Sequence, residues 1–169
     1  SMSDLPKRVV LHEQGPREGF QIEPGPISSE DKIAFIDALS ETGLRHIQVC
    51  SFVNPRVVPG WADAETVAGG FKVNPDVTYT ALWFNKDGLN RALAFKDRLT
   101  MTGSISLSAS DAFTRKNLHR SHEENLRAMR AQSEAHMAVG IPVTRIGVMA
   151  AFGCNYQGDV TPAEVVKTL

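Results

Sequence analysis

The sequence predicts an α/β fold in which parallel strands alternate with helices. Apolar, β-branched runs alternate with segments of helical periodicity along the whole chain. A strand and the helix that follows it take up roughly 30 residues, which is the length of one β/α crossover unit. Such crossovers are right-handed and generate a parallel sheet. No low-complexity segment or linker interrupts the pattern, and a length of 169 residues favours one domain.

The expected elements follow in order from the amino end. Residues 8–12 form an apolar run that is typical of a strand and leads into a Gly/Pro turn. Residues 28–42 are expected to form a helix because their apolar residues fall on one stripe. Ser28 or Ser29 can cap the start of this helix, and Gly43 can end it. The remaining strands are expected at 46–51, 77–83, 104–109 and 143–149, and the remaining helices at about 62–71, 86–95 and 121–139.

The carboxyl end of the sequence favours a partial barrel over a complete open sheet. Thr161 and Pro162 are typical of a helix start, and the fifth helix that they begin is still running at Leu169. A doubly wound sheet calls for a G-x-G-x-x-G turn after the first strand, which the Gly/Pro turn here does not match. A full barrel takes roughly 250 residues. We therefore expect a TIM (β/α)8 barrel type of fold, with about the first five β/α units in residues 8–169.

Composition excludes several classes of function. The chain has 18 basic and 19 acidic side chains, so no basic surplus indicates nucleic acid or an anionic membrane as a partner. Cys50 and Cys154 are far apart in sequence and are expected to be free thiols in a reducing compartment. No signal peptide is visible, and the protein is predicted to be cytoplasmic. Ser1 precedes Met2, so residues 1–7 are interpreted as a tag remnant and an N-terminal tail.

The turn after the first strand carries the sharpest candidate site. Arg17 lies next to Glu18, and parallel α/β folds bind ligands at the carboxyl ends of their strands. A guanidinium there can stabilise an enolate or carboxylate oxygen, and the carboxylate can bind a divalent cation. A salt-linked surface turn is the alternative. Gln48, near the end of the second strand, can hydrogen-bond a substrate or Arg17, or can satisfy a buried neighbour.

Further polar groups follow the later strands. Asn85 comes after the third strand, and Ser108 and Ser110 lie near the end of the fourth. Each of these side chains can face the site or cap the helix that follows it. Cys154 follows the fifth strand, and it is expected to be a packed or exposed thiol because no base can be named beside it.

The segment 111–122 is dense in polar groups and is expected to be a solvated loop. Asn117 can reach the pocket from this loop. Arg115 and Lys116 can meet an acyl-carrier phosphate, although a solvated position is the favoured interpretation for both. Ser121 is expected to cap the next helix, with a glutamate three residues later completing a capping box.

Four separated segments together match one family. They are GPREGFQIE at 15–23, SFVNPRVVP at 51–59 with the following Ala62-Asp63, ASDAF at 109–113 with Asn117 and Ser121, and GCNYQG at 153–158. In this order they resemble the motifs GPRDGLQNE, SFVSPKWVP with A-D, ASExF with N and S, and GCPYEG of the hydroxymethylglutaryl-CoA lyase family. The resemblance implies a metal-dependent TIM-barrel lyase with a pyruvate carboxyltransferase-like domain.

The resemblance also implies roles for individual residues. Arg17 matches the arginine that stabilises the enolate oxygen, and Glu18 stands where the family has a metal-binding aspartate. Gln48 replaces a family glutamate on the second strand, and an amide can neither carry that negative charge nor transfer a proton. The resulting candidates are Arg17 and Gln48 for catalysis, Glu18 for the metal, and Glu13, Gln21, Ser51, Asn85 and Asn117 for substrate binding.

The function implied by the resemblance is that of a lyase-like enzyme. It would cleave or form a carbon–carbon bond in a 3-hydroxyacyl-CoA or a related 3-hydroxy acid through a metal-polarised enolate. The cofactor would be Mg²⁺ or Mn²⁺. Its site is incomplete in these residues, because the family's His-x-His pair and catalytic cysteine loop lie on later strands, so this segment alone is expected to be inactive. The alternative is a non-catalytic ligand-binding or assembly protein on a degenerated barrel. Bare strand edges also favour a homo-oligomer.

Overall fold

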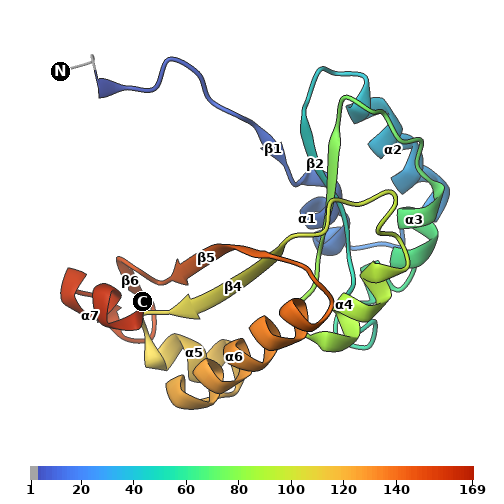
Figure 1. Ribbon diagram of the computed structural model, residues 1–169. Coiled ribbons are helices and arrows are strands. Elements are labelled where there is room, and N and C mark those ends of the chain that lie inside the picture. Colours follow the sequence, from blue (N-terminus) through green and yellow to red (C-terminus); the bar gives the residue numbers. More distant parts are fainter. Residues whose placement is uncertain (1–3) are drawn as a thin grey trace. The chain divides into compact units, whose positions relative to one another are not determined.

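The computed structural model describes residues 4–169 and divides into two compact units. Unit 1 ends at Met101, and unit 2 covers Thr102–Leu169. Of the predicted tag remnant and tail, residues 1–3 lie outside the described residues, and residues 4–7 are exposed. Parallel strands alternate with helices in both units (Figure 1), as the sequence predicts. No helix in the described part of the chain has the length and apolar character needed to cross a membrane.

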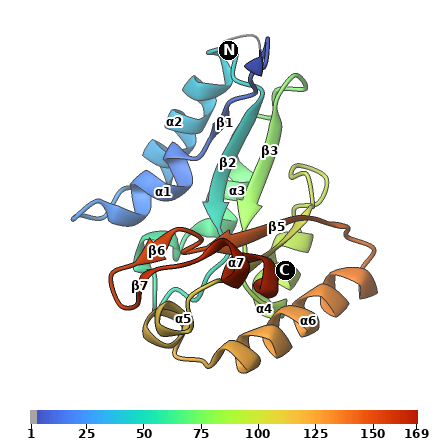
Figure 2. The same cartoon turned by 90° about the vertical axis from the view of Figure 1, so that its left-hand side faces the viewer.

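Unit 1 is built on a parallel sheet of three strands in the order β1–β2–β3. These strands are β1 (His12–Glu13), β2 (His46–Ser51) and β3 (Thr78–Leu82). His12 is paired with His46, which is paired with Thr78, so the three strands are aligned at their amino ends. Figure 2 shows α1 (Gly15–Ile22) and α2 (Ser29–Ser40) beside β2, on which both helices pack.

The other helical segments of unit 1 are the 3₁₀ helix η2 (Pro59–Trp61), α3 (Ala64–Gly70) and α4 (Lys86–Leu93). Side-chain caps fix two of the helix starts. The Ser28 hydroxyl accepts a hydrogen bond from the Asp31 backbone N–H, and the Asn85 side chain accepts one from the Gly88 N–H. Gly43 adopts a positive φ of 87° just after α2, which only glycine does without strain.

The core of unit 1 lies between its sheet and its helices. Ile36 of α2, Val49 of β2 and Val67 of α3 have no exposed surface, and the same is true of Trp61. Burial of such apolar surface is the main favourable term in folding.

Unit 2 contains the remaining strands and helices. Strand β4 (Gly103–Ser108) pairs in parallel with β5 (Val143–Met149), and the long helix α6 (His122–Ala138) packs on β4. Two short strands, β6 (Gly153–Cys154) and β7 (Gly158–Asp159), form an antiparallel hairpin. Helices α5 (Asp111–Leu118) and α7 (Pro162–Thr168) complete the unit. The start of α7 has the predicted Thr161 cap.

The first strand is much shorter than the predicted 8–12. Only His12–Glu13 form β1, because β2 begins at His46, which is the pairing partner of His12. Residues before His12 therefore have no partner on β2. The apolar side chains of Val9, Val10 and Leu11 are between 61% and 69% exposed.

The predicted Gly/Pro turn after the first strand is helix α1. Pro16 occupies the first turn of α1, where its fixed φ suits a helix and its missing N–H leaves no donor unsatisfied. The Glu18 N–H donates to the Gln14 carbonyl at 2.8 Å. The Glu18 carboxylate lies in the first turn, where its negative charge interacts favourably with the positive end of the helix dipole. The segment has eight residues and contains Pro16 and two glycines, which are residues typical of turns.

The predicted loop at 111–122 is largely helix α5. The Ser110 hydroxyl accepts from the Phe113 N–H at 3.1 Å, which confirms the capping interpretation of Ser110. His119 follows the last residue of the helix, and its backbone is left-handed with φ 52°. The predicted capping box of Ser121 at the start of α6 is present.

Candidate functional site

Arg17 is the centre of the candidate site in unit 1. Its Nε donates to Oε1 of Gln48 at 2.7 Å, and its Nη2 donates to Oε1 of Gln14 at 3.2 Å. The same guanidinium forms an ion pair with the Glu18 carboxylate. Its side chain is only 14% exposed, and burial lowers the pKa of Arg17 from its ordinary value. An arginine nonetheless stays cationic in proteins, so Arg17 presents a partly desolvated positive charge.

The structure therefore brings together the three predicted residues Arg17, Glu18 and Gln48. Of the two interpretations of Gln48, hydrogen bonding to Arg17 is the observed one. Neutral and charged oxygen acceptors hold the guanidinium, and its remaining N–H donors are suited to an anionic oxygen. Whether these groups act on a substrate stays a prediction.

Strand β2 also places Ser51 in unit 1. Its hydroxyl is fully buried, and it has no hydrogen-bond partner among residues 4–169. A buried hydroxyl without a partner costs free energy unless another group satisfies it. The pairing of β2 with β3 shifts register between Gln48 and Cys50, so strict alternation of faces along β2 does not hold.

Three further candidates in unit 1 have defined positions. The Glu13 carboxylate accepts from the Gly15 N–H at the start of α1. Gln21 is exposed near the end of α1. Asn85 uses its side-chain oxygen to cap α4, accepting from the Gly88 N–H at 2.9 Å. Glu13 and Asn85 thus have structural roles at helix starts, and their predicted contact with substrate stays a prediction.

The described residues do not form a metal site. No cluster of three or more His, Cys, Asp or Glu side chains occurs among them. Glu18, the predicted ligand, is committed to its ion pair with Arg17. A single carboxylate that is already paired with an arginine is an incomplete set of ligands for Mg²⁺ or a similar cation. The described residues therefore do not by themselves fit a divalent cation.

Unit 2 contains the remaining candidate, Asn117. It lines a pocket of about 380 Å³ together with Phe113 of α5, Ala150 and the hairpin residue Cys154. The Asn117 side-chain amide donates to the Phe113 carbonyl at 3.1 Å. The Cys154 sulfur lies 3.1 Å from the Ser110 hydroxyl.

The basic residues of α5 are positioned as the solvated interpretation predicts. Arg115 is exposed and pairs with Asp111 one turn earlier at 2.6 Å, and Lys116 is also exposed. The Arg115 hydrogen bond and the His122 backbone N–H lower the pKa of the Asp111 carboxyl. This pair stabilises the helix surface, with the small energy typical of exposed ion pairs.

Two residues around Arg17 have no part in the predicted site. Gln14 accepts from the guanidinium, and the Trp61 indole Nε1 donates to the Arg17 backbone carbonyl at 2.9 Å. The spacing of Gln14 three residues before Arg17 would reveal its contact only if the segment were known to be helical. The Trp61 contact links a side chain to a backbone atom 44 residues away, and no sequence pattern reports such a bond.

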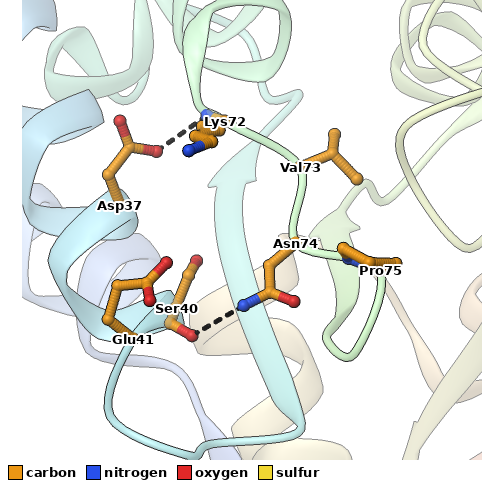
Figure 3. Close-up of a pocket in the computed structure, with 7 residues that line it drawn as sticks. All are labelled: Asp37, Ser40, Glu41, Lys72, Val73, Asn74 and Pro75. Atoms are coloured by element: carbon orange, nitrogen blue, oxygen red, sulfur yellow. Dashed lines mark hydrogen bonds between the residues drawn. The ribbon is translucent and has the colours of Figure 1, made fainter.

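A second pocket of about 230 Å³ lies near the amino ends of the strands of unit 1 (Figure 3). It is enclosed by the end of α2 and the segment before β3. Asp37 accepts from the Lys72 backbone N–H at 2.7 Å, and Asn74 donates to the Ser40 carbonyl at 3.2 Å. These bonds hold the 72–75 segment to α2 and involve none of the predicted site residues.

Comparisons with known proteins connect this geometry to one family. No protein-family model matches the chain. The hydroxymethylglutaryl-CoA lyase of Bacillus subtilis is 38% identical over 162 residues, which are 96% of this chain and 53% of that protein. The crystal structure of hydroxymethylglutaryl-CoA lyase from Pseudomonas aeruginosa matches with a TM-score of 0.85 and 38% identity, over 96% of this chain and 53% of that one. An HMG-CoA lyase from Acinetobacter baumannii, in complex with coenzyme A and 3-methylmalate, matches with a TM-score of 0.78 and 28% identity, over 94% of this chain and 50% of that one.

The chain spans about half the length of the curated relatives it matches. Its alternating parallel strands and helices correspond to about half of an HMG-CoA lyase barrel, and they do not close a barrel. This confirms the predicted α/β fold class and the predicted partial barrel. Over the part that it spans, the chain is homologous to hydroxymethylglutaryl-CoA lyases.

Proposed function

We propose that the protein carrying this chain is a carbon–carbon lyase that acts on a 3-hydroxyacyl-CoA or a related 3-hydroxy acid. The observation that carries the proposal is the Arg17 guanidinium, which is 14% exposed and is hydrogen-bonded to Gln48 on β2. Homology to hydroxymethylglutaryl-CoA lyases over this part of the chain supports the reaction class. The coenzyme A and 3-methylmalate bound to the Acinetobacter baumannii relative support the substrate class.

The proposed reaction places negative charge where Arg17 can stabilise it. A base removes the proton of the 3-hydroxyl group, and that oxygen becomes the carbonyl oxygen of one product. The bond between C2 and C3 breaks, and its electron pair moves onto C2 and the adjacent carbonyl oxygen as an enolate. Arg17 donates to this oxygen, and protonation of C2 completes the second product. Donors aimed at a developing oxyanion supply a large part of such catalysis.

Ser51 is the proposed partner of a polar substrate atom. Its buried hydroxyl has no partner among the described residues, and a substrate oxygen would satisfy it. Gln48, by contrast, is proposed to orient Arg17. Its amide has no ionisable proton, so it does not serve as the base.

The family resemblance implies Mg²⁺ or Mn²⁺ as a cofactor. The described residues do not by themselves fit such an ion. We therefore assign no step to a metal. The roles proposed for Arg17, Gln48 and Ser51 are orientation, charge stabilisation and hydrogen bonding.

A non-catalytic ligand-binding protein is the second candidate. Two observations favour it: Gln48 cannot transfer a proton, and Glu18 is paired with Arg17. Such a protein would bind an acyl-CoA or hydroxy acid through Arg17 and release it unchanged.

Turnover separates the two candidates. The protein at its full natural length is incubated with a panel of 3-hydroxyacyl-CoA esters with and without Mg²⁺ or Mn²⁺, and carbonyl product is measured. We expect cleavage of at least one ester, abolished in R17A and partly kept in R17K. The control R45A removes an exposed arginine of the same unit and should leave turnover unchanged. Binding without cleavage of any ester would establish the second candidate instead.

We also propose that the protein is cytoplasmic and self-associates. The exposed apolar residues Val9, Val10 and Leu11 beside the short edge strand β1 support contact with a second copy. Light scattering over a range of concentrations should show a mass that rises above the monomer. A monomer at every concentration would contradict self-association.

A further inference from the structure

We propose that Trp61 is a positioning residue that fixes the direction of the Arg17 guanidinium. This inference rests on the proposed lyase function, in which Arg17 stabilises an enolate oxygen. It deepens that function by naming the group that holds the helix carrying Arg17.

Helix α1 depends on contacts from other elements for its orientation. It has eight residues, and its N-cap residue Gln14 makes no side-chain capping hydrogen bond. Isolated helices of this length are unstable in water, so tertiary contacts must fix where α1 lies. Arg17 is in the first turn of α1, and a rotation of the helix would carry its Nε away from Gln48 on β2.

Trp61 makes a hydrogen bond to α1 at Arg17 itself. Its indole Nε1 donates to the Arg17 backbone carbonyl at 2.9 Å, and the side chain has no exposed surface. The Phe20 ring, one turn further along α1, packs edge-on against the indole with 6.3 Å between ring centroids. The indole therefore contacts α1 through both a hydrogen bond and an aromatic pair.

Gly60 brings η2 against the backbone of the same helix. A Cβ atom at this position would lie 3.0 Å from the Phe20 carbonyl oxygen and 3.6 Å from the Gln21 Cα. The absence of a side chain thus allows the close approach that puts the Trp61 N–H within reach of Arg17.

Lys32 of α2 also contacts the indole. Its Nζ lies 4.6 Å from the Trp61 ring centroid, donates to the Gly60 carbonyl at 2.6 Å, and pairs with Asp63 at 2.7 Å. The Lys32 side chain is only 3% exposed, and Ser29 donates to the second oxygen of Asp63. An ammonium that is so fully bonded holds the 60–63 segment firmly to α2. Trp61 therefore links the position of Arg17 to helix α2.

The test compares W61F with Y79F in the full-length protein. W61F keeps an aromatic ring and removes the N–H donor. Y79F removes a buried hydroxyl of the same unit that lies 2.8 Å from the Ser40 hydroxyl and accepts from the Asn74 backbone N–H at 3.1 Å. Both variants lose a buried hydrogen bond, and urea unfolding shows whether their free energies of unfolding fall by a similar amount.

The primary readout is the ¹H–¹⁵N signal of the Arg17 Nε–H group, assigned by its loss in R17K. We expect W61F to shift this signal and to speed its hydrogen exchange by at least about fivefold, and Y79F to leave it unchanged. In turnover assays, W61F should lower kcat by about tenfold and change KM by less than about twofold.

Equal effects of W61F and Y79F on the Arg17 signal would overturn the proposal, because Trp61 would then act only through stability. If W61F does not fold, benzothienylalanine placed at position 61 alone removes the N–H with the ring shape kept, and the same comparison applies. If the wild-type protein cleaves no ester, the proposed lyase function fails, while the Arg17 signal still decides the positioning role.

Discussion

The Nε–H group of Arg17 donates a 2.7 Å hydrogen bond to Oε1 of Gln48 and so joins helix α1 to strand β2 across 31 residues of sequence. The other two contacts of the guanidinium, with Gln14 and Glu18, come from its own helical segment. Gln48 is thus the contact that ties the guanidinium to the sheet.

Loss of the Gln48 amide should destabilise unit 1. Q48A leaves a largely buried charged donor without its acceptor, and we expect a decrease of about 1–3 kcal/mol in the free energy of unfolding. Urea denaturation measures the change. Q14A is the matched control, because Gln14 is exposed and accepts the longer 3.2 Å bond, so its effect should stay below about 0.5 kcal/mol. Equal losses in the two variants would contradict the importance of the bond to β2.

Restoring an acid at position 48 should change catalysis. Q48E gives Arg17 a charged partner and the site a group that can transfer a proton. General acid–base catalysis contributes about 10²–10⁴-fold in rate, and we expect at least about a tenfold rise in kcat. Steady-state kinetics with the best ester of the panel provide the measurement. An unchanged kcat would show that the amide at position 48 does not limit the reaction.

The pair of Glu65 and Arg91 predicts a pH dependence of stability. Arg91 donates to both carboxylate oxygens of Glu65, at 2.5 and 3.0 Å, and these bonds lower the pKa of Glu65 from its ordinary value of 4.5. A carboxyl whose pKa is depressed by folding contributes stability that is fully present above its unfolded pKa. That contribution is lost as the pH falls through the lower folded value.

We therefore expect E65Q to be less stable than the wild type at neutral pH, and the difference to vanish in acid. The pair is partly exposed, so the loss near pH 7 should be about 0.5–1 kcal/mol. Urea unfolding of both proteins between about pH 7 and pH 3 follows the change. E123Q removes an exposed ion pair with Arg127 and should show almost no loss at any pH. A constant difference for E65Q would rule out the titration.

The two cysteines should differ in reactivity. The Ser110 hydroxyl, together with backbone N–H groups of residues 156–158, lowers the pKa of the Cys154 thiol, whereas burial raises the pKa of Cys50. Iodoacetamide near pH 7 should alkylate Cys154 first, as mass spectrometry can show. S110A should slow this reaction by about threefold or more. S121A also removes a helix cap but does not affect Cys154, so its rate should be unchanged.

Much of the fold follows from local sequence patterns. The stripe of apolar residues in α2 and the apolar runs of β2 to β5 identify these elements by their spacing, although no residue of β5 is fully buried. Helices α1 and α5 are not predicted. Each has only eight residues; α1 contains the turn-forming Pro16 and two glycines, and α5 lies in a segment dense in polar residues. The length of β1 is set by where β2 begins.

Part of the candidate site is predictable from the sequence. Arg17 and Glu18 are neighbours in the chain, and parallel strands bring Gln48 to the same end of the sheet. The bond from Trp61 to Arg17 depends on a helix at 15–22 and on the missing side chain of Gly60, so it emerges only from the assembled unit.

The glutamine at position 48 also sets how the site receives anions. Arg17 and Glu18 cancel each other's charge, and the amide adds none, so the three side chains sum to zero instead of the −1 that an acid would give. A carboxylate or thioester oxygen that approaches Arg17 therefore meets no uncompensated negative neighbour among them. Affinity for acidic ligands is favoured at the expense of proton transfer.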